Sequence, residues 1–159
     1  MKKYELTEEK KEFLGRTLYR IRALKDFELL DGTIIHAGDL GGWIEKEDNL
    51  SQEGSAWVSG EAWVSGKARV SGKARVSGNA RVYRIEHIMT FGPAGSRNGT
   101  TTFYRNKNNG ISVTCGCFNG SIEGFLARVN ETHGDNKHGQ VYRAAAELAK
   151  LQIDLEGEQ

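Results

Sequence analysis

The sequence predicts a mixed β/α protein built around a short left-handed parallel β-helix, with an N-terminal β cap and a C-terminal α+β unit of three strands and two helices. Three observations lead to this fold class: a six-residue repeat in the middle of the chain, alternating apolar and polar residues before it, and helical periodicity after it. We expect the cap and a first irregular coil in residues 1–55, the β-helix in residues 56–82 and the α+β domain in residues 83–159.

The repeat has the form Ala-x-Val-Ser-Gly-x and occurs five times without a gap. Within each unit, alanine and valine share one face of a short extended segment, and the residue between them points the other way. Serine and glycine then supply a corner, because glycine tolerates backbone angles that a Cβ forbids. Short strands with a corner in every unit suit a three-sided coil of about 18 residues, whose narrow interior alanine and valine would fill.

This geometry predicts which residues are neighbours. Residues one coil apart should lie side by side, about 4.8 Å from each other. Trp57 would then lie beside Arg75, and Trp63 beside Arg81, with all four side chains on the outside. Each pair could form a cation–π contact or a solvated ladder, and an oligomer could use this surface.

The segments that flank the repeat show strand patterns. Residues 17–24 and 33–36 alternate well enough for strands, and the N-terminal segment would cap the open end of the β-helix, which is otherwise an unpaired strand edge. After the repeat, residues 83–91, 100–105 and 111–115 read as three further strands.

Two amphipathic helices should follow these strands. Ser121 is a candidate N-cap for the first helix, and apolar residues recur after it at helical spacing. The apolar face of the second helix is predicted to contain Val141, Ala144, Ala145, Leu148 and Leu151. Both helices would cover one face of the C-terminal sheet.

The formal net charge is +1, but the charges are spread unevenly. Residues 1–55 carry 9 Lys/Arg and 12 Asp/Glu, residues 56–82 carry 5 and 1, and residues 83–159 carry 8 and 8. The positive repeat could attract an anionic partner. Its arginines would point to different sides of the coil and form no continuous stripe, so we do not expect nucleic acid as a partner.

The chain is expected to be cytoplasmic. It begins with charged residues that do not resemble a signal peptide, and no apolar run approaches the roughly 20 residues that span a bilayer, so no membrane partner is expected. A single residue separates Cys115 from Cys117, and reduced thiols explain this pair better than a strained bridge.

Several stretches resemble hexapeptide-repeat β-helix proteins of phages and prophages. The resemblance rests on residues 17–24, on residues 38–45 with the sequence Gly-Asp-Leu-Gly-Gly-Trp-Ile-Glu, and on the repeat itself. Residues 91–105 and 132–136 also look like a module of phage proteins. The resemblance implies a phage accessory protein in the cytoplasm of the infected bacterium, and such proteins often interfere with host defence.

The Gly-rich loop of residues 95–102 is the most suggestive ligand site. Glycines let backbone N–H groups approach a ligand, Arg97 can grip a phosphate through two hydrogen bonds, and the threonines add hydroxyl donors. Phe91 and Tyr104 could stack on a base. The plainer interpretation is a hairpin connection whose threonines are solvated. The candidate ligand-binding residues are Phe91, Ser96, Arg97, Asn98, Thr100, Thr101, Thr102, Tyr104 and Arg105.

Two chemical functions are alternatives to binding. Hexapeptide β-helices are common in acyltransferases, but the repeat contains no histidine to act as a general base, and His36 and His87 only flank it. A zinc site is a second possibility, although zinc motifs usually space their cysteines by two to four residues. Its ligands would be Cys115, Cys117, His133 and His138.

These observations favour a non-enzymatic, homo-oligomeric binding protein without a cofactor, metal or catalytic residue. It would sequester a phosphate-bearing small ligand, such as a nucleotide signal of host defence, or bind a host defence protein. The alternative is a hexapeptide-repeat acyltransferase that uses acetyl-CoA.

Overall fold

The strands and helices are described for residues 2–13, 15–95, 97–153 and 155 of a computed structural model. Within these residues the chain forms 13 strands, two α-helices and two single-turn 3-10 helices. In chain order they are β1 (Tyr4–Phe13), β2 (Arg16–Ala23), β3 (Phe27–Glu28), β4 (Ile34–Ile35), β5 (Leu40–Ile44), η1 (Glu47–Asn49), β6 (Trp57–Val58), β7 (Trp63–Val64), β8 (Arg75–Val76), β9 (Arg81–Val82), η2 (Ile85–His87), β10 (Ile88–Ala94), β11 (Gly99–Arg105), β12 (Ile111–Cys115), β13 (Phe118–Ser121), α1 (Ile122–His133) and α2 (Lys137–Gln152).

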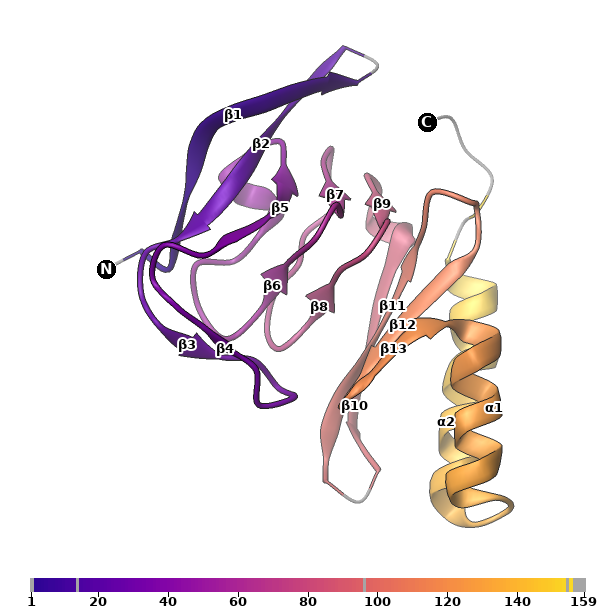
Figure 1. Ribbon diagram of the computed structural model, residues 1–159. Coiled ribbons are helices and arrows are strands. Elements are labelled where there is room, and N and C mark those ends of the chain that lie inside the picture. Colours follow the sequence, from indigo (N-terminus) through magenta and orange to yellow (C-terminus); the bar gives the residue numbers. More distant parts are fainter. Residues whose placement is uncertain (1, 14, 96, 154, 156–159) are drawn as a thin grey trace.

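The described strands form four sheets (Figure 1). A mixed five-stranded sheet has the order β1-β2-β5-β7-β9, in which β1, β2 and β5 are antiparallel neighbours and β5, β7 and β9 are parallel. A four-stranded antiparallel sheet has the order β10-β11-β12-β13. Two small sheets consist of β3 with β4 and of β6 with β8.

The expected fold class, a short left-handed parallel β-helix with a three-stranded α+β unit, is therefore wrong. The repeat strands belong to two different sheets, and one of these is a mixed sheet that begins with the long N-terminal hairpin. Each repeat strand is only 2 residues long, so its length does not determine which strand it pairs with. The longest strands of the mixed sheet are β1, with 10 residues, and β2, with 8 residues. The C-terminal sheet has a fourth strand, β13, because a tight turn at Gly116 sends the chain back along β12.

The predicted neighbours within the repeat are confirmed. Trp57 pairs with Arg75, and Trp63 pairs with Arg81, both in parallel register. The alanines and valines of the repeat are all at most 1 % exposed, and together they form the core of this part of the protein. The six-residue period therefore gives the correct register and the correct interior, although the sheet that results is mixed.

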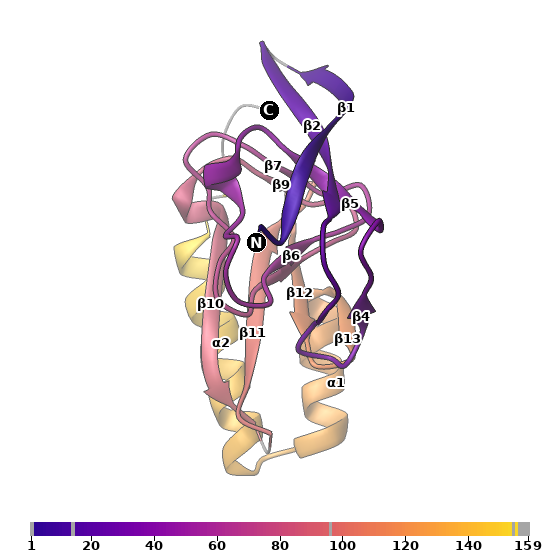
Figure 2. The same ribbon diagram turned by 90° about the vertical axis from the view of Figure 1, so that its left-hand side faces the viewer.

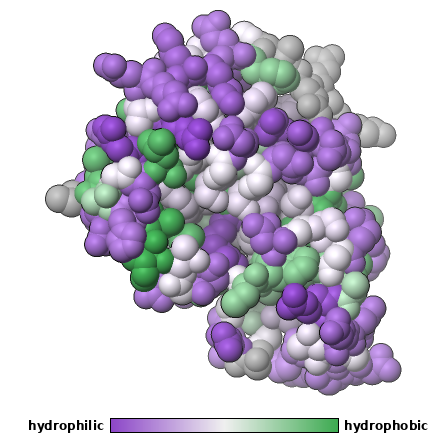
Figure 3. Space-filling model, in the orientation of Figure 1, coloured by the Kyte–Doolittle hydropathy of each residue, from purple (hydrophilic) through white to green (hydrophobic). Residues whose placement is uncertain are grey.

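The two tryptophan–arginine pairs differ in their surroundings. Arg81 lies over the Trp63 ring, with 3.6 Å between Cζ and the ring centroid, so of the two alternatives the cation–π contact is the one found there. Trp57 was expected on the outside but is 2 % exposed, because its ring packs against Tyr4 and Phe27 from the N-terminal segment. The hydrophilic surface over the β1–β2 hairpin and the more apolar surface over β3 and β4 are visible in Figure 3.

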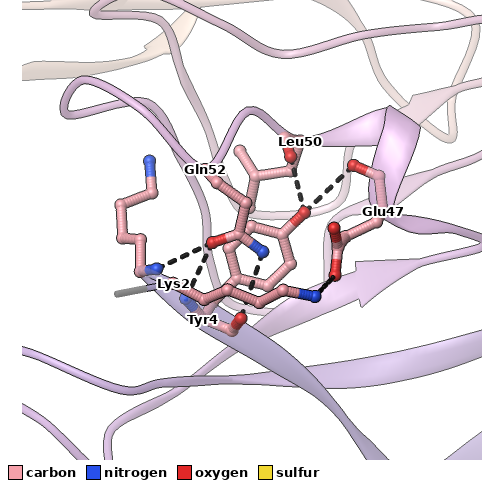
Figure 4. Close-up of polar contacts among 6 residues, drawn as sticks. Lys2, Tyr4, Glu47, Leu50 and Gln52 are labelled. Carbon is pink, nitrogen blue, oxygen red and sulfur yellow. Dashed lines mark hydrogen bonds and ion pairs between the residues drawn. The ribbon is translucent and has the colours of Figure 1, made fainter.

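The N-terminus is tied to the segment that precedes the repeat (Figure 4). The Tyr4 hydroxyl donates to the carbonyl oxygens of Glu47, at 3.1 Å, and Leu50. The Gln52 side-chain amide forms two hydrogen bonds with the backbone of Tyr4. Its Oε1 accepts from Tyr4 N, and its Nε2 donates to Tyr4 O. Behind it, the buried Lys3 ammonium donates to the carbonyl oxygen of Ala56 at 2.6 Å. These contacts fix the start of β1 against the repeat.

The four-stranded sheet is covered by α1 and α2 on the side away from the repeat, as Figures 1 and 2 show. Ser121 is the N-cap of α1, as predicted, and its Oγ accepts from Gly124 N at 3.1 Å. The buried face of α2 differs from the prediction: small residues and Tyr142 face the core, whereas Leu148 is 52 % and Leu151 is 85 % exposed. Within the described residues, neither helix is long and apolar enough to cross a bilayer.

The other face of this sheet is joined to the repeat through threonine hydroxyls. Thr102 Oγ1 accepts from Arg75 N at 3.2 Å, and Thr114 Oγ1 donates to Arg75 O at 2.8 Å. Both threonines are at most 2 % exposed. The free edge of β8 is therefore satisfied by side chains and not by a further strand.

Candidate functional site

A cavity of about 560 Å³ lies where the end of the repeat meets the N-terminal hairpin. Its walls come from the ends of β1 and β2, from the segment that follows β7, and from residues 81–86. Three aromatic rings line it: Phe13, Trp63 and Tyr83. We call this cavity the basic pocket, for the cations described next.

Five cationic side chains and one carboxylate, Glu86, line the basic pocket among the described residues. The cations are Arg16, Lys67, Arg81, Arg84 and Arg105. Lys67 and Arg81 belong to the repeat, and Arg84 follows directly after it. Part of the positive charge of residues 56–82 therefore lies in this cavity. Such a concentration of charge beside apolar rings favours an anionic ligand with an apolar part.

Trp63 and Arg81 both line the basic pocket. The Trp63 ring contacts Arg81 and also Phe13, whose ring is tilted by 59° with 4.9 Å between the two ring centroids. The Arg81 guanidinium donates to two carbonyl oxygens, those of Glu61 at 3.1 Å and Ala80 at 2.9 Å. Its position is therefore fixed by backbone acceptors and by the ring, and not by a carboxylate.

The charge of Arg81 has no carboxylate in ion-pair contact in the part of the chain that the structure describes. Glu61, the nearest candidate, is bound to Lys11 at 3.6 Å and to Arg20 at 3.5 Å. Burial lowers the pKa of the Arg81 guanidinium, and the charge of Arg105 adds to this effect while Glu61 opposes it. A partly buried guanidinium whose charge is disfavoured by its surroundings would be stabilised by an added anion.

Tyr83 and residues of η2 also line the basic pocket. The Tyr83 ring lies 5.4 Å from Arg105 Cζ and 4.4 Å from the ring of His87, measured to the ring centroids. His87 is fully buried, and its Nδ1 accepts from the backbone N–H groups of Tyr83, at 3.1 Å, and Arg84, at 3.2 Å. His87 therefore shapes the turn that presents Tyr83 and Arg84.

The nine residues predicted to bind ligand do not converge on one place. Arg97 and Asn98 are exposed in the β10–β11 connection, and Ser96 lies outside the described residues. Thr100 is half-buried, and Phe91 packs against the helix-covered core. Neighbours on a strand point to opposite faces, so the run of threonines is divided between the two sides of β11.

Three of these residues have structural partners on the two sides of β11. Thr101 donates to Cys115 Sγ at 3.2 Å on the helix-covered side, and Thr102 bonds to the repeat. Tyr104 is buried against the repeat, its hydroxyl lies 3.3 Å from Ser77 Oγ, and burial raises its pKa. Arg105 is the one predicted ligand residue that lines the basic pocket. A binding role for the other eight stays a prediction.

The cysteines and histidines do not form a metal centre in the described chain, where no three His, Cys, Asp or Glu side chains gather around one point. Cys115 is half-buried and Cys117 is exposed, and both are free. The Cys115 thiol lies 4.0 Å from the Tyr142 hydroxyl, and burial together with Cys115 raises the pKa of Tyr142 to about 12.

One feature of the sequence pointed to the basic pocket, the net positive charge of the repeat. Phe13 and Arg16 were not singled out, because they lie about fifty residues before Lys67 and no linear motif joins them. The pairing of β2 with β5, of β5 with β7 and of β7 with β9 brings the hairpin and the end of the repeat together.

Comparison with protein-family models, with curated proteins and with solved structures finds no match to this chain.

Proposed function

We propose that this chain is a binding protein that captures a phosphate-bearing small molecule in the basic pocket. The observation that carries the proposal is Arg81, a partly buried guanidinium beside a second arginine, held by backbone carbonyl oxygens and a tryptophan ring. A phosphate at the partly exposed Arg81 guanidinium would supply a negative partner and would accept charge-assisted hydrogen bonds.

The rest of the lining supports the same class of ligand. Lys67 and Arg84 are exposed at the cavity, where they can meet a phosphate from solution. The three rings give apolar contact area for the remainder of the ligand, which inorganic phosphate would not use. The cavity volume of about 560 Å³ lies within the range of roughly 300–1,000 Å³ typical of small-molecule sites.

The wider role follows from the sequence resemblance. A phage accessory protein that sequesters a nucleotide signal of host defence, as a homo-oligomer in the cytoplasm of the infected bacterium, would need a pocket of this kind and no catalytic group. Capture of a host protein would instead use an extended surface.

Isothermal titration calorimetry with AMP, ADP, acetyl-CoA and inorganic phosphate tests the proposal. We expect saturable binding of at least one nucleotide, with an affinity that falls as salt is added. Lys67→Ala should weaken binding about five-fold, the effect of losing one exposed ionic contact. Lys73→Ala is the matched control, because Lys73 holds the same position in the next repeat unit but does not line the pocket.

The variants also locate the site. If Arg97→Ala abolishes binding and Lys67→Ala does not change it, the ligand occupies the loop of residues 95–102 and the pocket assignment is wrong. Release of free CoA from acetyl-CoA in the presence of an acceptor would favour an acyltransferase instead. No binding by any of the four compounds would contradict the proposal.

A further inference from the structure

We infer that Glu45 limits the affinity of the basic pocket for anions, because it holds two hydrogen-bond donors that a phosphate in the pocket would need. This inference rests on the proposed function, since it assumes that the pocket binds a phosphate-bearing molecule. It adds a residue that controls how tightly this molecule is held, and it predicts a variant that binds better than the wild type.

The Glu45 carboxylate holds both donors through one oxygen atom. Its Oε1 accepts from Gly66 N at 2.8 Å and from Arg16 Nη1 at 2.9 Å. The three residues come from separate segments: Arg16 begins β2, Glu45 directly follows β5, and Gly66 follows β7. The parallel pairing of Ile44 with Val64 brings the last two together. A backbone N–H group and a guanidinium that meet at one oxygen are donors of the kind that proteins use for phosphate.

The two donors line the cavity, whereas the carboxylate that holds them does not. Arg16 and Gly66 are part of the lining, and Glu45 is not. The backbone of Gly66 has one N–H group, so it cannot donate fully to Glu45 and to a ligand at the same time. A phosphate in the cavity must therefore compete with Glu45 for these donors.

The bond from Gly66 to Glu45 is not a general property of the repeat. The Ser-Gly corners at Gly60, Gly66, Gly72 and Gly78 share one backbone conformation, with φ between 60° and 65°. Among the residues that the structure describes, Gly66 is the one glycine of these four whose N–H group donates to a side chain. The bond therefore depends on the place of Glu45 and not on an unusual turn.

The contact is weak enough for a ligand to replace it. The side chains of Arg16 and Glu45 are 45 % and 26 % exposed, and water screens ion pairs with such exposure. A phosphate monoester carries a charge of about −1.5 to −2 at neutral pH, against −1 for a carboxylate. Lys67, the residue after Gly66, is exposed at the cavity and has no ion pair in the described chain, so it can add a further cation to the phosphate. A bound phosphate can therefore take these donors from Glu45, at a cost in affinity.

Glu45→Gln tests the inference, because it keeps an acceptor of similar shape for Gly66 and removes the competing charge. AMP, ADP, acetyl-CoA and inorganic phosphate are titrated into the wild type and into the variant by calorimetry. A compound that binds should bind the variant about five-fold tighter, the effect of one partly exposed ionic contact. Damage to the fold would lower the affinity, so a gain separates release of the donors from a structural defect. Binding by the wild type without a gain in the variant would overturn the inference alone.

Loss of any carboxylate near the pocket favours anions, so the effect must be shown to act through the released donors. Glu86→Gln is the control, because Glu86 lines the cavity but has no contact with Arg16 or Gly66 among the described residues. The gain from Glu45→Gln should fall to about two-fold or less when Arg16→Ala is also present, while any gain from Glu86→Gln should be the same with and without Arg16→Ala. A gain from Glu45→Gln that does not depend on Arg16 would reflect charge alone and would contradict the inference.

The wild type also allows a measurement without any variant. Ligand binding should shift the amide resonance of Gly66 in proton–nitrogen correlation spectra, because its acceptor changes from Glu45 to the ligand. The resonance of Gly72 should stay in place, since Gly72 holds the same position in the next repeat unit and does not line the cavity. Binding that leaves the Gly66 resonance unchanged would overturn the inference and leave the proposed function intact. Failure of all four compounds to bind either the wild type or Glu45→Gln would overturn both.

Discussion

The threonine contacts at the free edge of β8 give a prediction that can be worked out from the structure. Thr114 Oγ1 donates to Arg75 O at 2.8 Å, and the threonine is 2 % exposed. Thr114→Val keeps the shape of the side chain but removes the donor, which leaves a buried carbonyl oxygen without this partner. An unsatisfied buried polar group costs about 1–3 kcal/mol. We therefore expect Thr114→Val to lower the free energy of unfolding by about 2 kcal/mol.

Denaturant unfolding followed by circular dichroism measures this change, and a fall in Tm of about 4–8 °C should accompany it for a chain of this size. Thr102→Val removes the matching acceptor of Arg75 N and should cost a similar amount. Thr100→Val is the control, since Thr100 is half-buried on the same strand and the described residues show no hydrogen bond from its hydroxyl. If Thr114→Val is as stable as the control, the hydroxyl does not hold the sheet to the repeat and the reasoning fails.

Three further predictions concern stability. Burial, reinforced by the charge of Lys25, lowers the pKa of Lys3 from 10.5 to about 8, so the unfolded chain binds more protons between these pH values. The free energy of unfolding should therefore rise between about pH 8 and about pH 10.5, by at most about 3 kcal/mol, and this rise should be missing in Lys3→Met; an equal rise in both proteins would assign it to other groups. Gly66→Ala should destabilise the fold by at least about 2 kcal/mol more than Gly72→Ala in urea titrations, because both glycines have positive φ but only at Gly66 would the Cβ meet a backbone oxygen, at 2.4 Å. Leu151→Gln should leave Tm within about 2 °C, because the side chain is 85 % exposed, and a large loss would show that a partner covers it in solution.

The sequence was informative where one physical signal dominates. The recurrence of alanine and valine every six residues, with about 18 residues in each coil, predicted that Trp63 pairs with Arg81 and that Val64 and Val82 lie inside, and a slip of one residue would turn these side chains to the other face. Ser121 was identified as an N-cap for a similar reason, since its side chain has one favourable partner, the N–H group of Gly124.

The sequence failed where two arrangements satisfy the same pattern. In α2, both a leucine-containing face and an alanine-containing face are apolar, and periodicity alone favoured the larger residues. The structure buries Ala145, Ala146 and Ala149, because small side chains let the helix approach the sheet and α1 closely. Similarly, nothing local in a two-residue strand such as β7 reveals that its sheet will be completed by the N-terminal hairpin.

The candidate site was the hardest part to predict. Arg105 was one of the predicted ligand residues, and the structure places it in the lining of the basic pocket, but its neighbours there come from distant segments. In the sequence, the three consecutive threonines of residues 100–102 resemble a set of hydroxyl groups that could bind one phosphate together. In the folded chain the alternation of a strand sends Thr101 toward the helices and Thr102 toward the repeat.

The two walls of the basic pocket come from segments on either side of repeat strand β7 in the mixed sheet. Phe13 and Arg16 belong to the hairpin that opens the mixed sheet, and Tyr83 and Arg84 follow β9, which closes it. Insertion of three repeat units would add one strand between β7 and β9 and move these walls apart by about 4.8 Å. The number of repeat units therefore sets the width of the pocket, and a gain or loss of one strand would change the size of the molecule that it admits, while the threonine hydroxyl contacts to Arg75 remain the same.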